Sequence, residues 1–191
     1  TLPASGTLRL SGVAIVAGQI VNVADINAGL LSYSPVTNIN GSAVASFTFQ
    51  VRDNGGTLNG GVDEDASANT LTIDVTAVND TPINTVPGSI SVTEDVATAL
   101  TGISIADVDA ASSSMLVTLS AATGSIAATT GGGVTVGGSA SARTLTGTVS
   151  AINAFIAASN VTYTTASDAN GSVTLTVLTS DQGNTGSGGT L

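Results

Sequence analysis

The sequence contains no cysteine, histidine, tryptophan or lysine. Without cysteine the chain has neither a disulfide framework nor thiolate chemistry. Because histidine is also absent, zinc, copper and haem sites and histidine-based catalytic relays are effectively excluded. The side chains that remain for chemistry are Asp and Asn, which join backbone carbonyl groups as the hard oxygen ligands that calcium prefers. We therefore expect no enzymatic activity, and calcium is the expected bound ion.

Positive charge is scarce. Three Arg stand against thirteen acidic residues, which gives a net charge of −10. Phosphate contacts need clustered Lys and Arg, so we expect no binding to nucleic acid. An anionic membrane surface would repel the chain, and its apolar runs are far too short to span a bilayer. We therefore expect no membrane insertion.

Two stretches of the chain can be superimposed with identical spacing. Tyr33–Gly41 reads YSPVTNING, and Tyr163–Gly171 reads YTTASDANG. Each is followed by an alternating apolar strand that ends in Asp-x-Gly, at Asp53 in one copy and at Asp181 in the other. The repeat predicts one folding unit used at least twice.

Strand patterns dominate both copies. Apolar residues alternate with polar ones over 47–52, 71–77 and 173–177, which is the period of a half-buried strand, and 90–92 predicts a further short strand. Asn-Gly pairs mark turns between them. The exception is 151–158, which could form one or two helical turns, with 24–28 as its counterpart. Short strands and frequent turns predict an all-β fold of tandem sandwich domains.

The repeat also predicts the domain boundaries. Pro82 cannot continue a strand ladder, so we expect one β-sandwich over 1–80 and another over 81–191. Aligned copies leave the first unit without a counterpart of about 83–121 and the second without a counterpart of about 64–80. We expect the chain to be a window on a longer tandem array. The alternative is that neighbouring molecules supply the missing strands at open sheet edges.

Acidic residues recur at defined places in the pattern. Glu94 and Asp95 follow the first strand of the second unit, and Asp107-Val-Asp109 comes about twelve residues later. Alternate residues of an extended chain point the same way, so this pair would place two carboxylates on one side of a loop. Such groups gathered in one place would repel each other without a cation, and calcium takes six to eight oxygen ligands.

At these residues the chain resembles the cadherin repeat. Val78-Asn-Asp-Thr-Pro82 resembles the cadherin linker, Thr93-Glu-Asp95 the Pro-Glu-Asn motif, and Asp107-Val-Asp109 the Asp-x-Asp motif. The Tyr-x6-Asn-Gly pattern and Gly186–Gly189 are more similar still to cadherin-like tandem repeats of giant bacterial surface proteins, including the extender regions of calcium-dependent adhesins. The resemblance implies an Ig-like Greek-key sandwich and an extracellular location on a bacterial surface.

The resemblance also implies metal ligands at the joint between units. They would be Asn79, Asp80, Asp107, Asp109 and Asp181, joined by Asn38 or Asn40 from the first unit. Glu94 and Asp95 would face the next joint. Asn38 and Asn40, or Asp168 and Asn170 in the second unit, lie where cadherins carry Asp-Arg-Glu, and Asp53 carries the Asp-x-Gly motif.

The ligand set departs from the family pattern, because Ala77 replaces the first Asp of the linker and Asn replaces charged ligands at 38 and 40. We therefore expect one or two ions per joint, with dissociation constants of about 0.1–1 mM, as in extracellular modules.

The expected function is that of a structural spacer, an extender in a long adhesin or filament. Calcium would clamp adjacent repeats of the chain into a stiff rod. One alternative is a module whose loops, over 54–62 and 183–189, bind glycans or a partner protein. Another is a subunit that assembles with identical chains into a surface layer or filament by strand exchange.

Overall fold

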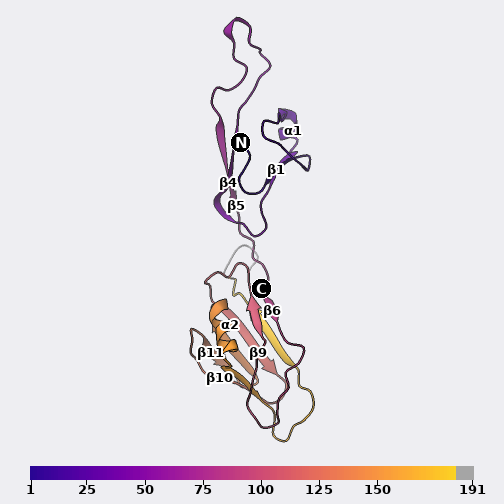
Figure 1. The fold of residues 1–191 in the computed structure, drawn as a ribbon, viewed down its shortest axis with the longest axis vertical. Helices are drawn as coiled ribbons and strands as arrows, with labels where there is room; N and C mark the ends of the chain where they lie inside the picture. The colour runs from indigo at the N-terminus through magenta and orange to yellow at the C-terminus, as the bar shows by residue number, and fades with distance from the viewer. Residues whose placement is uncertain (184–191) are drawn as a thin grey trace. The chain divides into compact units, whose positions relative to one another are not determined.

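The structure is a computed structural model that describes residues 1–183 (Figure 1). Most of its regular structure is β-strand in several small sheets, which confirms the predicted all-β class. The chain divides into unit 1, Thr1–Ala77, and unit 2, Val78–Leu191. The motif Gly186–Gly189 and most of the loop 183–189 lie outside the described residues.

Unit 2 contains two main sheets. The first has the strand order β10 (Ser125–Ala128), β13 (Val161–Thr164), β7 (Thr98–Ala99). The second has the order β11 (Thr135–Gly138), β12 (Ala142–Gly147), β9 (Met115–Ala121), β14 (Leu175–Ser180). A separate pair joins β6 (Ile83–Thr85) to β8 (Ser104–Ala106), and every pairing is antiparallel.

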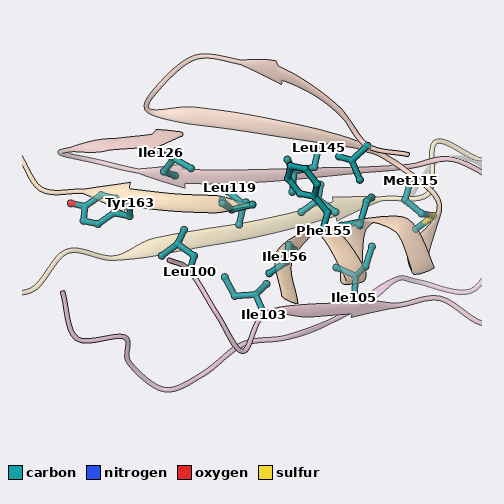
Figure 2. Packing of buried hydrophobic residues seen from close by; sticks show 14 of the residues in the cluster. Leu100, Ile103, Ile105, Met115, Leu119, Ile126, Leu145, Phe155, Ile156 and Tyr163 are labelled. Carbon is teal, nitrogen blue, oxygen red and sulfur yellow. The ribbon is translucent and has the colours of Figure 1, made fainter. Parts of the chain in front are cut away.

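One apolar core lies within unit 2 (Figure 2). Strand β9 is central to it, because Met115, Val117 and Leu119 alternate along the strand and all three are fully buried. Ile126 and Tyr163 reach the same core from the other sheet. Both sheets therefore bury one face against a shared interior, as the period-2 pattern requires.

Helix α2 (Val149–Ala157) closes part of this core with Ile152, Phe155 and Ile156. Thr148 caps its first turn by accepting a hydrogen bond from the amide of Ala151. The side chain of Asn153 bonds both backbone groups of Ile105 in β8, at 2.9 and 2.8 Å. An amide side chain thus satisfies an otherwise unpaired strand edge.

Unit 1 is built from fewer pairings. One sheet has the order β2 (Val13–Ala14), β1 (Thr7–Leu10), β3 (Leu31–Ser34), and a separate hairpin joins β4 (Gly41–Phe49) to β5 (Asn69–Val75). The unit also holds a short helix, α1 (Val23–Asn27), and one 3-10 turn, η1 (Leu58–Gly60). Leu8 and Ala45 are its buried apolar side chains.

The same tyrosine contact occurs in both units and supports the repeat. Tyr33 donates to the carbonyl of Ser5 at 2.9 Å, and Tyr163 donates to the carbonyl of Thr123 at 3.1 Å. The next residue is glycine in both units, with φ of +72° at Gly6 and +76° at its counterpart, which lies against the tyrosine ring. Any side chain there would meet the ring, so glycine is required at both positions.

The two helices end in the same way, which confirms the predicted helical turns. In α1 the amide of Ala28 donates to Ala24 and the amide of Gly29 to Ile26. In α2 the amide of Ala158 donates to Ala154, and the amide of Ser159 to Ile156. Gly29 and Ser159 both have positive φ, so the same turn leads each helix into β3 or β13.

Two predicted strands need correction. No strand covers 90–92; Ile90 instead packs against the edge of the unit 2 core from a segment without ladder bonds. The strand predicted over 173–177 is β14, displaced to Leu175–Ser180, because its pairing with β9 begins at Leu175. Period-2 alternation identifies an inward face but does not determine where ladder bonds begin.

Candidate functional site

Three acidic loops of unit 2 meet through hydrogen bonds. The side-chain amide of Asn79 donates to a carboxylate oxygen of Asp181. The backbone amide of the next residue, Asp80, donates to Asp109 Oδ2 at 2.6 Å. Because Asn79 and Asp80 are adjacent, these bonds bring the segments at 79–80, 107–109 and 181–183 together, as the sequence predicts for this part of the ligand set.

The Asp-x-Asp loop is organised by Asp107. Its Oδ1 accepts hydrogen bonds from the amides of Asp109 and Ala110, at 2.8 and 2.9 Å. Its Oδ2 is buried and, among residues 1–183, is the buried side-chain oxygen or nitrogen that has no hydrogen-bond partner. A buried polar group without a partner costs about 1–3 kcal/mol, and a charged one more, so this oxygen is suited to a cation.

Asp181 lies deeper than the other acidic residues of the loop set. It is 1% exposed, and the linked Asn79 is 8% exposed. Its Oδ1 accepts from the amide of Gly183 at 2.9 Å, which forms the predicted Asp-x-Gly turn. A carboxylate this deeply buried must be compensated by hydrogen bonds or a nearby positive charge.

The chemistry of this loop set fits a hard cation. It offers carboxylate oxygens from four Asp residues, Asp80, Asp107, Asp109 and Asp181, and an amide oxygen from Asn79, with no nitrogen or sulfur ligand. In the part of the chain that the structure describes, no three acidic side chains are already grouped closely enough to hold a metal ion. Ion binding would therefore require these side chains to turn toward a common point, with the Asn79 amide presenting its oxygen.

Two other predicted ligands lie in a turn of unit 1. Asn38 and Asn40 are both exposed, and Asn38 has a φ of +61°. The equivalent turn of unit 2 has Asp168 at φ +53°, with Asn170 two residues later. A residue with a short polar side chain tolerates this left-handed conformation, so turn geometry alone is sufficient to account for Asn and Asp there.

Glu94 and Asp95 lie in a separate exposed turn of unit 2. The amide of Asp95 donates to Thr165 Oγ1 at 2.9 Å, which links this turn to the segment that follows β13. Among the described residues, no hydrogen bond joins either of them to the three-loop set.

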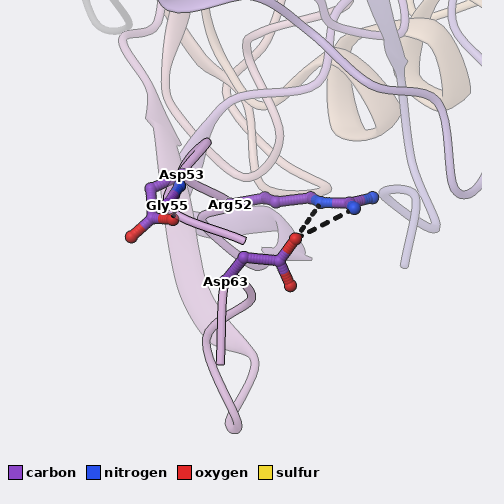
Figure 3. A network of polar contacts seen from close by, with 4 residues as sticks. All are labelled: Arg52, Asp53, Gly55 and Asp63. Atoms are coloured by element: carbon purple, nitrogen blue, oxygen red, sulfur yellow. Dashed lines mark hydrogen bonds and ion pairs between the residues drawn. The ribbon is translucent and has the colours of Figure 1, made fainter. Parts of the chain in front are cut away.

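Asp53 forms the unit 1 copy of the Asp-x-Gly turn (Figure 3). Its Oδ1 accepts from the amide of Gly55 at 2.8 Å, as Asp181 does in unit 2. Asp53 is exposed, whereas Asp181 is buried. The same turn is thus placed in two different environments.

The sequence did not indicate the polar contacts that close the long β4–β5 loop. The Arg52 guanidinium bonds Asp63 Oδ2 through Nε at 3.2 Å and Nη2 at 3.0 Å (Figure 3). Nearby, hydrogen bonds from the Ser67 amide, and then from the Asn69 side chain, lower the pKa of Asp65 below its ordinary value. These carboxylates serve local loop structure.

Comparison with protein-family models, with curated proteins and with solved structures gave no match. None of the helices within residues 1–183 is long and apolar enough to cross a membrane.

Proposed function

We propose that the chain is a structural spacer made of tandem cadherin-like repeats with an Ig-like Greek-key arrangement. In this proposal it belongs to a long extracellular adhesin or filament of a bacterial surface and has no catalytic role. The repeated tyrosine contact and repeated helix ends support a single unit used twice. Because the two copies are nearly equivalent, a mechanical role shared by both is favoured over specialised recognition by the loops of one copy.

The observation that carries the proposal is the state of Asp107. One oxygen fixes the loop through two backbone amides, and the other is buried without a partner. Calcium would supply the missing positive charge. Asp107, Asp109 and Asp181 would hold it, with Asp80 and the amide oxygen of Asn79 completing the unit 2 donors.

Ion binding would stiffen the chain because its donors come from three separate loops and include the segment 79–80 that begins unit 2. An ion that binds only the ordered loops stabilises them by RT ln(1 + [Ca]/Kd), about 1.4 kcal/mol per site at ten times Kd. Several sites along an array would add. Such an array would be stiff where calcium is plentiful and flexible where it is scarce.

The test is small-angle scattering from a chain that carries several tandem copies, measured in 10 mM calcium and then in excess chelator. We expect the maximum dimension and the persistence length to fall when calcium is removed. A matched chain with Asp107→Asn and Asp109→Asn in every copy should show the short, flexible profile in both buffers. Identical profiles for the unmodified chain in both buffers would exclude the calcium-stiffened spacer.

A further inference from the structure

Unit 1 leaves an apolar face of its strands uncovered. Along the β4 hairpin, Phe49 is 43% and Val51 is 58% exposed. The inward-facing alternation of this segment is the same as in unit 2, where Leu175 and Val177 of β14 pack against the core. The sequence of unit 1 therefore encodes a buried face that its described residues do not bury.

The internal repeat identifies which unit 2 strand corresponds to β4. Both β4 and β14 run toward an Asp-x-Gly turn, at Asp53 and Asp181, which aligns Phe49 with Val177. The segment from Gly41 to Asp53 is two residues longer than the segment from Gly171 to Asp181. The two extra residues are absorbed by the register shift between Gly41 and Ala45.

In unit 2 the equivalent face is covered by residues 83–121. Strand β9 pairs with β14, with Leu119 opposite Val177, and β7 pairs with β13. Strand β9 supplies three fully buried side chains, Met115, Val117 and Leu119. Within the described part of unit 1, β4 pairs with β5, and β3 with β1, with no counterpart of β7 or β9.

The position of Thr1 corresponds to the end of β9 beside β14. Thr1 precedes Gly6 by the same five residues that separate Leu119 from Gly124. The amino group of Thr1 donates to the carbonyl of Thr48 on the outer edge of β4, at 3.1 Å. In the aligned register this is within one residue of the place where the end of β9 meets β14.

We propose that the uncovered face of unit 1 is a receptor for a β-segment with the apolar alternation of residues 83–121. The segment enters antiparallel to β4, in the register of β9 on β14, with its end beside Thr1. Its inward residues are three or four large apolar side chains at alternate positions, and it covers Phe47, Phe49 and Val51. This inference does not depend on calcium.

The experiment uses the full chain and a longer version in which a second copy of residues 81–120 replaces Thr1 and Leu2 ahead of Pro3. Amide hydrogen exchange is followed in excess chelator, so that failure of the calcium proposal cannot affect the outcome. We expect exchange over 45–49 and 31–34 to slow by about 100-fold in the longer chain, because those ladders become internal. Exchange over 161–164 should be unchanged.

The matched control carries Val117→Asp and Leu119→Asp in the added copy alone, and should show no protection of unit 1. Equal protection by this control, or none by the unmodified segment, would overturn the proposal. Exchange of the original chain that slows as its concentration rises would also overturn it, since a second copy would then cover the face.

A cross-link tests the register even if exchange data are complicated by aggregation. The chain has no cysteine, so Gln50→Cys can be combined with Thr118→Cys in the added copy. In the aligned register these positions are opposite each other, as Leu178 and Thr118 are in unit 2. We expect a disulfide to form rapidly there and at least tenfold more slowly when Ser120→Cys replaces Thr118→Cys. Equal rates would exclude the proposed register.

Discussion

Replacing Asp107 with Asn should have opposite consequences with and without calcium. Asn keeps an oxygen that can accept from the amides of Asp109 and Ala110, and it removes the charge on the buried, unpartnered Oδ2. In chelator the variant no longer pays the cost of burying a charged oxygen at position 107. This gain offsets the weaker hydrogen bonds that the Asn oxygen accepts from the two backbone amides. We therefore expect the variant to match the unmodified chain to within about 1 kcal/mol, or to be the more stable of the two.

In 10 mM calcium the order should reverse. This calcium concentration is at least tenfold higher than the dissociation constant of about 0.1–1 mM expected for an extracellular site. At a tenfold excess over Kd the unmodified unit gains about 1.4 kcal/mol per ion, whereas Asp107→Asn gains little. For a domain of roughly a hundred residues this corresponds to a rise of about 6 °C in the unfolding temperature of the unmodified chain.

The assay is thermal unfolding followed by circular dichroism, in chelator and in 10 mM calcium. Asp25→Asn is the matched control, because it removes one negative charge from an exposed helix of unit 1. It should behave as the unmodified chain does in both buffers. A calcium response of equal size in Asp107→Asn and the unmodified chain would refute the reasoning about Oδ2.

Three further predictions concern local structure. Gly124→Ala should destabilise unit 2 by about 2–4 kcal/mol in chemical denaturation, because φ is +76° and the new Cβ would lie 2.6 Å from the Tyr163 hydroxyl. Leu119→Ala should cost about 2–5 kcal/mol in the same assay, since the side chain is fully buried. Asn69→Ala should raise the pKa of Asp65 toward 3.8 in an NMR titration, by removing one of the hydrogen bonds that lower it.

The lowered pKa of Asp65 also makes the folding stability depend on pH. The pKa of Asp65 is lowered in the folded chain, so its hydrogen bonds contribute stability above the ordinary value of 3.8 that is lost as pH falls below it. The Asn69→Ala variant should therefore lose less stability on acidification than the unmodified chain. A Gly124→Ala variant as stable as the original would contradict the claim that a side chain at this position meets Tyr163. An unchanged Asp65 pKa in Asn69→Ala would contradict the claim that the Asn69 hydrogen bond lowers it.

The sequence was sufficient for the class of fold, the helical turns and part of the site. Alternation over 47–52 predicted a strand, but β4 ends at Phe49, and both Phe49 and Val51 are exposed. Repeat spacing predicted that α1 and α2 would be counterparts. Neither pattern shows which strand becomes central, so alternation alone does not identify β9, in which Met115, Val117 and Leu119 are fully buried.

For the candidate site, the resemblance to the cadherin repeat implied that the segments around Asn79, Asp109 and Asp181 would meet, and hydrogen bonds join them. It could not reveal that Asp107 divides its two oxygens between a loop and a buried, unpaired position, because this depends on tertiary packing. Nor could it distinguish the buried Asp-x-Gly turn from the exposed one at Asp53, since both copies have the same local sequence signature.

The most direct measurement is a calorimetric titration of the full chain with calcium, alongside Asp107→Asn and the Asp25→Asn control. Saturable binding at about 0.1–1 mM in the unmodified chain and in Asp25→Asn, with at least a tenfold loss of affinity in Asp107→Asn, is the predicted result. An absence of binding heat in the unmodified chain up to 10 mM calcium, at two temperatures, would contradict the proposal that a cation binds the three acidic loops of unit 2.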